Sequence, residues 1–113
     1  MYEYQATIRS IYDGDTCRAD IDLGFGIWTA NQQLRLIGID APEMGTTEGK
    51  QARDYLRELM PVGTTVRLRT HKDEAEKYGR WLAEIYLTEP AGTDVNQTMV
   101  LTGHAVPYDG GPR

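Results

Sequence analysis

The hydrophobic pattern of the chain changes its period once, and this change limits the folds that the sequence can adopt. As far as Ile39, apolar and polar residues alternate, which is typical of strands with one buried and one exposed face. From Thr46 or Thr47, apolar side chains instead recur at positions 52, 55, 56, 59 and 60, the spacing of an amphipathic helix with a threonine N-cap. The sequence therefore predicts that strands come first and that a helix packs against them.

The rest of the chain completes this order of elements. Strands are expected over about residues 4–8, 17–23, 29–39, 66–70 and 81–87, and helices from 46 or 47 to 60 and over 95–102. Pro61 and Gly63 are expected to end the first helix, and Gly103 the second. Five short strands interrupted by a helix favour a mainly β fold with α (α+β). The expected form is a five-stranded barrel of the OB type, with one amphipathic helix and one short helix packed on it.

Length and charge narrow the class of protein. A chain of 113 residues fits one domain, so a single domain is expected over residues 1–113. The one cysteine, Cys17, cannot form a disulfide within the chain and is expected to be a small buried residue. A net charge of −5 argues against a protein that passively coats nucleic acid. It leaves room for an enzyme on nucleic acid, which needs positive charge only where it holds a phosphate.

The sequence also predicts a location. No segment has the ~18 consecutive apolar residues of a membrane span. The first five residues lack the basic start and apolar core of a signal peptide. We therefore expect a cytoplasmic protein without a membrane partner, a monomer by default, with a phage or mobile-element origin compatible with the sequence.

Three short motifs carry side chains suited to chemistry. They are Asp-Gly-Asp-Thr at 13–16, Arg-Leu-Ile-Gly-Ile-Asp-Ala-Pro-Glu at 35–43 and Lys-Tyr-Gly-Arg at 77–80. Each alone has an ordinary interpretation: a hairpin turn, a solvated strand face with a proline turn, and a glycine loop. Their meaning therefore depends on the combination.

Taken together, the motifs supply the groups that phosphodiester hydrolysis requires. Two carboxylates at strand ends, Asp15 and Asp40, could converge on one hard cation, with Glu43 just beyond. Such a cation offsets the charge of a phosphate as a Lewis acid. Arg35 and Arg80 could hold the phosphate oxygens in bidentate pairs, and a carboxylate could orient or deprotonate the attacking water.

In this order and register, the motifs resemble the staphylococcal-nuclease (thermonuclease, SNase-like) family over about residues 4–106. The resemblance implies a calcium-dependent nuclease that hydrolyses phosphodiester bonds of DNA or RNA. Single-stranded DNA and RNA are the implied substrates, and 3′-phosphate ends the implied products. The same resemblance implies the OB-type barrel that the hydrophobic pattern favours.

The resemblance also implies a role for each motif residue. Ca²⁺, with Mg²⁺ or Mn²⁺ as alternatives, is bound by the carboxylates of Asp15 and Asp40 and the backbone carbonyl of Ala41. Glu43 is the general base or water-positioning group. The implied phosphate ligands are Arg35 and Arg80, and the expected substrate-binding residues are Lys77, Tyr78 and Tyr108.

This sequence departs from the family pattern in three places. Ala41 stands where the best-known members carry Thr, a change that leaves the backbone carbonyl in place. The loop 44–49 contains no Lys or Arg, which predicts a weaker grip on nucleic acid there. The C-terminal helix of longer relatives is expected to be absent from the domain.

Two other functions remain open from the residues. One is a catalytically silent OB-type module that binds nucleic acid or protein, and the other is a structural or inhibitory role in a complex. A silent module has no reason to hold carboxylates close together without a cation, so the enzyme is favoured. Surface or packing roles are expected for His71 and His104, and core or barrel-edge positions for Trp28 and Trp81.

Overall fold

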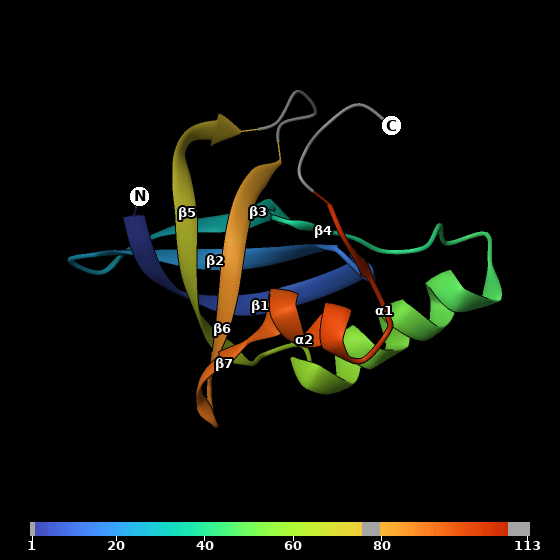
Figure 1. Cartoon of the computed structure of the whole chain (residues 1–113). Coiled ribbons are helices and arrows are strands. Elements are labelled where there is room, and N and C mark those ends of the chain that lie inside the picture. Colours follow the sequence, from blue (N-terminus) through green and yellow to red (C-terminus); the bar gives the residue numbers. More distant parts are fainter. Residues whose placement is uncertain (1, 76–79, 109–113) are drawn as a thin grey trace.

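Five long strands close into a barrel in the computed structural model, which describes residues 2–75 and 80–108 (Figure 1). The barrel strands are β1 (Tyr2–Asp13), β2 (Thr16–Gly24), β3 (Ile27–Leu36), β5 (Thr65–Ala75) and β6 (Trp81–Thr88). The other elements are β4 (Ile39–Asp40), α1 (Thr47–Leu59), β7 (Ala91–Asp94), α2 (Val95–Leu101) and β8 (Val106–Pro107). The expected mainly β barrel with two helices is thus confirmed.

The barrel closes through one short parallel seam. Neighbouring strands in the order β3-β2-β1-β5-β6-β7 pair antiparallel, whereas β3 and β6 pair parallel. The seam joins Leu34 to Trp81, and the register continues to Leu36 opposite Ala83. In Figure 1, β5 and β6 cross in front of β1, β2 and β3, and both helices lie at one end of the barrel.

Apolar and polar side chains alternate along the strands, as the sequence predicts, and the apolar ones fill the barrel. In β1, Ala6 and Ile8 point inward, and a register shift between Ile8 and Ser10 moves the inward set to Ile11. A bulge of this kind inserts one residue and reverses the faces beyond it. Cys17 is buried, and burial raises the pKa of its thiol to about 12.

Both helices are capped and packed on the barrel. The Thr46 side chain accepts a hydrogen bond from the Gly49 N–H at 3.0 Å, which confirms the threonine N-cap of α1. Helix α2 is fixed by Asn96, whose Nδ2 donates to the carbonyls of Ile37 at 2.9 Å and Ala83 at 3.0 Å. The buried Asn96 therefore ties α2 to the segment that leaves β3.

The structure corrects the expected bounds of the third strand. It was expected over 29–39, but β3 ends at Leu36, and β4 begins only at Ile39. Gly38 between them has a φ of 83°, a left-handed conformation that interrupts a strand. The short strands β4, β7 and β8 were also missed, because two to four residues carry too little periodicity to be recognised.

Two large apolar side chains of the β2–β3 hairpin are exposed. Leu23, the last residue of the alternating apolar set of β2, is 47% exposed. Trp28 is 51% exposed and lies outside the core. Trp81, in contrast, lies at the edge of the barrel and is 37% exposed.

The helices are short. Within residues 2–75 and 80–108, neither is long and apolar enough to cross a membrane. The longer one, α1, has 13 residues, whereas a membrane span needs about 20.

Candidate active site

Strand pairing brings the first two motifs together. The turn at 13–16 joins β1 to β2, and Thr16 lies opposite Arg35 in the β2–β3 register. The Leu36 N–H donates to the carbonyl of Asp15 at 2.8 Å, which extends the pairing by one residue. A turn and a strand end that lie twenty residues apart in sequence are therefore held side by side by main-chain hydrogen bonds.

Arg35 lies between two carboxylates. Its Nη1 is 3.6 Å from Oδ2 of Asp15, and its Nη2 is 3.8 Å from Oδ1 of Asp40. The residue is only 7% exposed, and Nη1 also donates to the carbonyl of Leu36 at 2.8 Å. The interpretation of Arg35 as a solvated strand residue is therefore wrong. The hydrogen bond to Leu36 holds the guanidinium in place. The two ion pairs are longer than hydrogen bonds, so the guanidinium can still donate to a further anion.

Asp15 is fixed by two hydrogen bonds from neighbouring groups. Its Oδ2 accepts from the Ala41 N–H at 2.9 Å, and its Oδ1 accepts from the Thr16 hydroxyl at 3.1 Å. The first bond ties the turn at 13–16 to the segment that follows β4. Asp15, Asp40 and Ala41, the expected metal ligands, therefore belong to one connected cluster.

Two further elements add an arginine and an aromatic ring to this cluster. Nη1 of Arg80, just before β6, lies 3.5 Å from the Thr16 hydroxyl. Strand β8 pairs with β4, and Tyr108 follows it, with its N–H donating to the Gly38 carbonyl at 2.8 Å. The Cζ atom of Arg35 lies 5.8 Å from the centre of the Tyr108 ring. Arg80 and Tyr108 thus reach the cluster from different parts of the chain.

Asp13 adds a third carboxyl group that the sequence interpretation left in a plain turn. Burial, followed by the side-chain hydrogen bond with Asp15, raises the pKa of Asp13 to about 6. Thr16 was also missed as a site residue, although its hydroxyl lies between Asp15 and Arg80. The available signal was that both residues belong to the same short motif as Asp15.

The donor set fits a hard divalent cation. Carboxylate and carbonyl oxygens are the ligands that Ca²⁺ and Mg²⁺ prefer, and both ions commonly complete their shells with water or phosphate oxygens. Among the described residues, no group of three or more His, Cys, Asp or Glu side chains gathers as a ready-made metal cage. Asp15 and Asp40 would therefore supply only part of a coordination shell and leave room for substrate oxygens.

The expected water-positioning residue is not in contact with this cluster. Glu43 is exposed, and its carboxylate makes no hydrogen bond or ion pair with any other residue in 2–75 or 80–108. Its backbone is well held, because its carbonyl accepts from the N–H of Thr46 at 3.0 Å and from the Thr46 hydroxyl at 2.6 Å. Two expected substrate-binding residues, Lys77 and Tyr78, lie outside the described residues.

Two glycines allow the motif segments to pack tightly on α1. A Cβ built on Gly14 would lie 2.7 Å from the Cβ of Ala41 and 2.8 Å from that of Ala52. A Cβ on Gly49 would overlap the carbonyl oxygen of Glu43. Helix α1 therefore serves as the support against which both acidic segments are packed.

The two histidines make packing contacts elsewhere. His104 stacks on Tyr55 with ring centres 4.2 Å apart, and Nε2 of His71 lies 3.3 Å from a carboxylate oxygen of Glu84.

These observations define a class: a small β barrel with a cluster of arginines and carboxylates where β2, β3 and β4 meet. The chain belongs to the staphylococcal nuclease homologue family, whose model matches residues 33–111. This match covers well over half of the chain, and the family resemblance stated from the motifs is thereby confirmed.

Relatives carry names that fit this family. The chain is 34% identical over 114 residues to the micrococcal nuclease of Shigella flexneri, covering 94% of this chain and 59% of that protein. It is 35% identical over 83 residues to the thermonuclease of Staphylococcus hyicus, covering 68% and 45%. It is 27% identical over 117 residues to endonuclease YhcR of Bacillus subtilis (strain 168), covering 94% and 9%. The chain thus spans less than two thirds of the length of each of these curated relatives.

Proposed function

We propose that this chain is a metal-dependent nuclease that hydrolyses phosphodiester bonds in single-stranded DNA or RNA. The observation that carries the proposal is the nearly buried Arg35 guanidinium, held 3.6 Å from Asp15 and 3.8 Å from Asp40. The guanidinium supplies a phosphate ligand, and the two carboxylates beside it supply a site for a metal ion. Membership of the nuclease family supports the same reaction.

In the proposed mechanism, the two arginines hold the phosphate. Arg35 keeps its orientation through the Leu36 carbonyl, and Arg80 lies beside Thr16 at the rim of the cluster. Guanidinium groups bind phosphate oxygens in pairs and stabilise the negative charge that increases as water adds to phosphorus. Because Arg35 lies in the barrel strand β3 and Arg80 directly precedes β6, little reorganisation is needed when the substrate binds.

The cation site consists of the carboxylates of Asp15 and Asp40 and the backbone carbonyl of Ala41. These groups would hold Ca²⁺, with Mg²⁺ or Mn²⁺ as alternatives. The bound cation supplies Lewis-acid stabilisation of the phosphate charge. The hydrogen bonds from Thr16 and from the Ala41 N–H keep the Asp15 carboxylate in one orientation.

Glu43 accepts the proton of the attacking water. The new bond forms between the water oxygen and phosphorus, and the bond from phosphorus to the 5′ oxygen breaks with its electron pair on that oxygen. The 5′ oxygen takes a proton from solvent and leaves as a 5′-hydroxyl end, and a 3′-phosphate end remains. Glu43 follows Ala41 after a single proline, and its segment is packed on Gly49 of α1. Since its carboxylate is exposed, it is able to turn toward a bound substrate and its water.

Substrate contacts beyond the reacting phosphate are assigned to three residues. Tyr108 packs beside Arg35 and offers its ring to the nucleotide. Lys77 and Tyr78 stay as predictions from the family resemblance.

The deciding experiment is cleavage of a fluorescent single-stranded DNA oligomer, and of its RNA counterpart, by the purified chain. Cleavage that requires Ca²⁺, Mg²⁺ or Mn²⁺ and stops with a chelator is the expected result. A folded sample that cleaves neither oligomer with any of these ions would overturn the proposal in favour of a silent binding module.

Calcium should stabilise the folded chain. Asp15 and Asp40 carry like charges in one cluster, and a ligand that binds only the folded state adds about 2.7 kcal/mol at 100 times its Kd. For a chain of this size, that corresponds to a rise in Tm of about 10 °C. The measurement is thermal unfolding with Ca²⁺ and with chelator. Asp40→Asn should abolish the rise, and Asp54→Asn on the surface of α1 should retain it. A wild-type Tm that none of the three ions changes would contradict the site.

Replacing Gly49 should slow cleavage, although Gly49 itself is not one of the reacting groups. In Gly49→Ala, the new methyl group would displace the backbone of Glu43, and a displacement of about 1 Å costs up to roughly 10²-fold in rate. The matched control is Gly45→Ala, because nothing lies within 4 Å of its added Cβ. Both variants are assayed well below their own Tm. Equal cleavage rates for the two variants would show that the position of Glu43 is irrelevant.

A further inference from the structure

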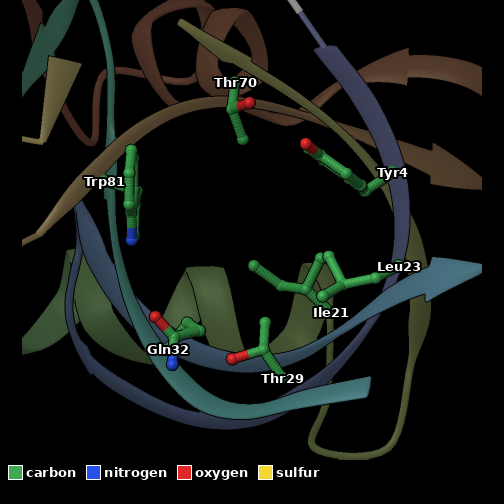
Figure 2. A pocket seen from close by; sticks show the side chains of 7 residues that line it. All are labelled: Tyr4, Ile21, Leu23, Thr29, Gln32, Thr70 and Trp81. Atoms are coloured by element: carbon green, nitrogen blue, oxygen red, sulfur yellow. The ribbon is translucent and has the colours of Figure 1, made fainter. Parts of the chain in front are cut away.

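The barrel has an open mouth with a pocket inside it (Figure 2). The pocket has a volume of about 250 Å³. Side chains from all five barrel strands line it: Tyr4, Ile21, Leu23, Thr29, Gln32, Thr70 and Trp81. Figure 2 looks along the barrel, with α1 behind the pocket, so the mouth lies away from the end that this helix covers.

The strand register explains why this end stays open. The seam between β3 and β6 begins only at Leu34 opposite Trp81, so the earlier part of β3 has no partner from β6. A register shift between β2 and β3 separates Thr29 from Gln32, and Asn31 between them has a φ of 55°. Both side chains line the mouth, where Figure 2 shows Gln32 on the same side of the opening as Trp81, with Tyr4 on the opposite side.

The lining suits a flat, uncharged ligand. None of the seven side chains carries a charge at neutral pH, and two of them are aromatic. Gln32 and two threonines add hydrogen-bonding groups, and the Gln32 amide is oriented by donation from Nε2 to the Ala30 carbonyl at 3.1 Å. Drug-sized ligands need about 300–1,000 Å³, so this pocket fits a single small ring system. A nucleobase has these properties: a flat aromatic face and polar edges.

The pocket and the proposed phosphate site are joined by two neighbouring residues of the chain. Trp81, on its wall, directly follows Arg80, whose guanidinium lies 3.5 Å from Thr16 in the candidate active site. Successive side chains of a strand point to opposite faces and lie only about 3.3 Å apart along it. A strand of nucleic acid with a phosphate at Arg80 would therefore pass over the rim of the barrel to place a base in the mouth.

We propose that the mouth of the barrel binds one unpaired base of the substrate strand, stacked on Trp81 and held at its edge by Gln32. This inference rests on the proposed nuclease function and adds a base subsite to it. A base can enter the pocket only after it has left its neighbours in the strand, so the subsite favours single-stranded over double-stranded substrates.

Fluorescence of Trp81 tests the subsite without cleavage. The chain has two tryptophans, so Trp28→Phe leaves Trp81 as the only indole. This variant is titrated, in chelator, with a single-stranded DNA oligomer and with an abasic deoxyribose-phosphate oligomer of equal length and charge. The expected result is quenching by the oligomer with bases and little change with the abasic one. Equal responses to both oligomers, or binding of neither, would overturn the inference.

Matched substitutions provide the second readout. Trp81→Ala should weaken binding of the DNA oligomer by roughly 5- to 150-fold, the range for loss of one base–aromatic stack, while Trp81→Phe should retain most of the affinity. Trp28→Ala, outside the pocket, is the control and should bind like the wild type. Unchanged affinity in Trp81→Ala would overturn the subsite. Base-dependent quenching in a chain that never cleaves would overturn the nuclease proposal alone, whereas cleavage without such quenching would overturn the subsite alone.

Discussion

Glu43→Gln should slow cleavage by roughly 10²- to 10⁴-fold and leave Tm nearly unchanged. Glutamine has the same shape but cannot accept the proton of the attacking water. The side chain is exposed and bonds to no other described residue, so its replacement removes no contact that supports the fold. The measurement is kcat on a single-stranded oligomer with Ca²⁺, next to thermal unfolding of the same sample.

The control for this variant lies a few residues away. Glu48→Gln removes an exposed carboxylate in the first turn of α1 and should cleave at the wild-type rate. If Glu43→Gln turned over as fast as Glu48→Gln, the general base would have to be another group, and Asp13 would be the next carboxyl to test.

Replacement of Arg35 should abolish most activity and also affect the fold. Loss of one charge-stabilising donor typically costs roughly 10²- to 10³-fold in kcat. Removing one partner of a buried ion pair costs about 3–5 kcal/mol, and Asp15 would lose this partner at 7% exposure. Arg35→Ala is therefore expected to lose both kcat and Tm, as measured by cleavage kinetics and thermal unfolding.

Arg35→Lys separates these two effects. Lysine keeps the positive charge between Asp15 and Asp40 but lacks the planar fork that binds two phosphate oxygens. We expect this variant to retain most of the stability while its kcat falls by roughly 10²-fold. Arg9→Lys, on the exposed face of β1, is the matched control with no expected change. Wild-type kcat in Arg35→Lys would remove the bidentate phosphate contact from the mechanism.

Local periodicity was sufficient to predict most of the barrel. The alternation at Cys17 and Ala19, and the helical spacing after Thr46, depend on residues close in sequence, so both were confirmed. The bulge after Ile8 and the turn at Gly38 were missed for a different reason. Each is fixed by pairing with a distant strand, and no periodicity within the segment itself indicates it.

The candidate active site also combines features that the local sequence predicts with features that depend on pairing between distant strands. The motifs identified Arg35 and the two aspartates, but not that Arg35 lies buried between them, because this depends on the Thr16–Arg35 register. The approach of Tyr108 to Arg35 depends on β8 pairing with β4, and two-residue strands carry no signal of their own. The pocket at Trp81 likewise follows from the point at which β6 joins β3.

The parallel seam also has a consequence for the order of folding. Arg35 lies opposite Leu82 in the middle of the three paired positions that close the barrel. Contacts between segments so far apart in the chain incur a large loop-closure entropy, so they tend to form late. The antiparallel hairpin of β2 and β3 can align Asp15 with Arg35 early, but Arg80 arrives only when β6 docks. A chain with an incomplete barrel would therefore hold only one of the two arginines of the proposed phosphate site, and the proposed nuclease activity would appear late in folding.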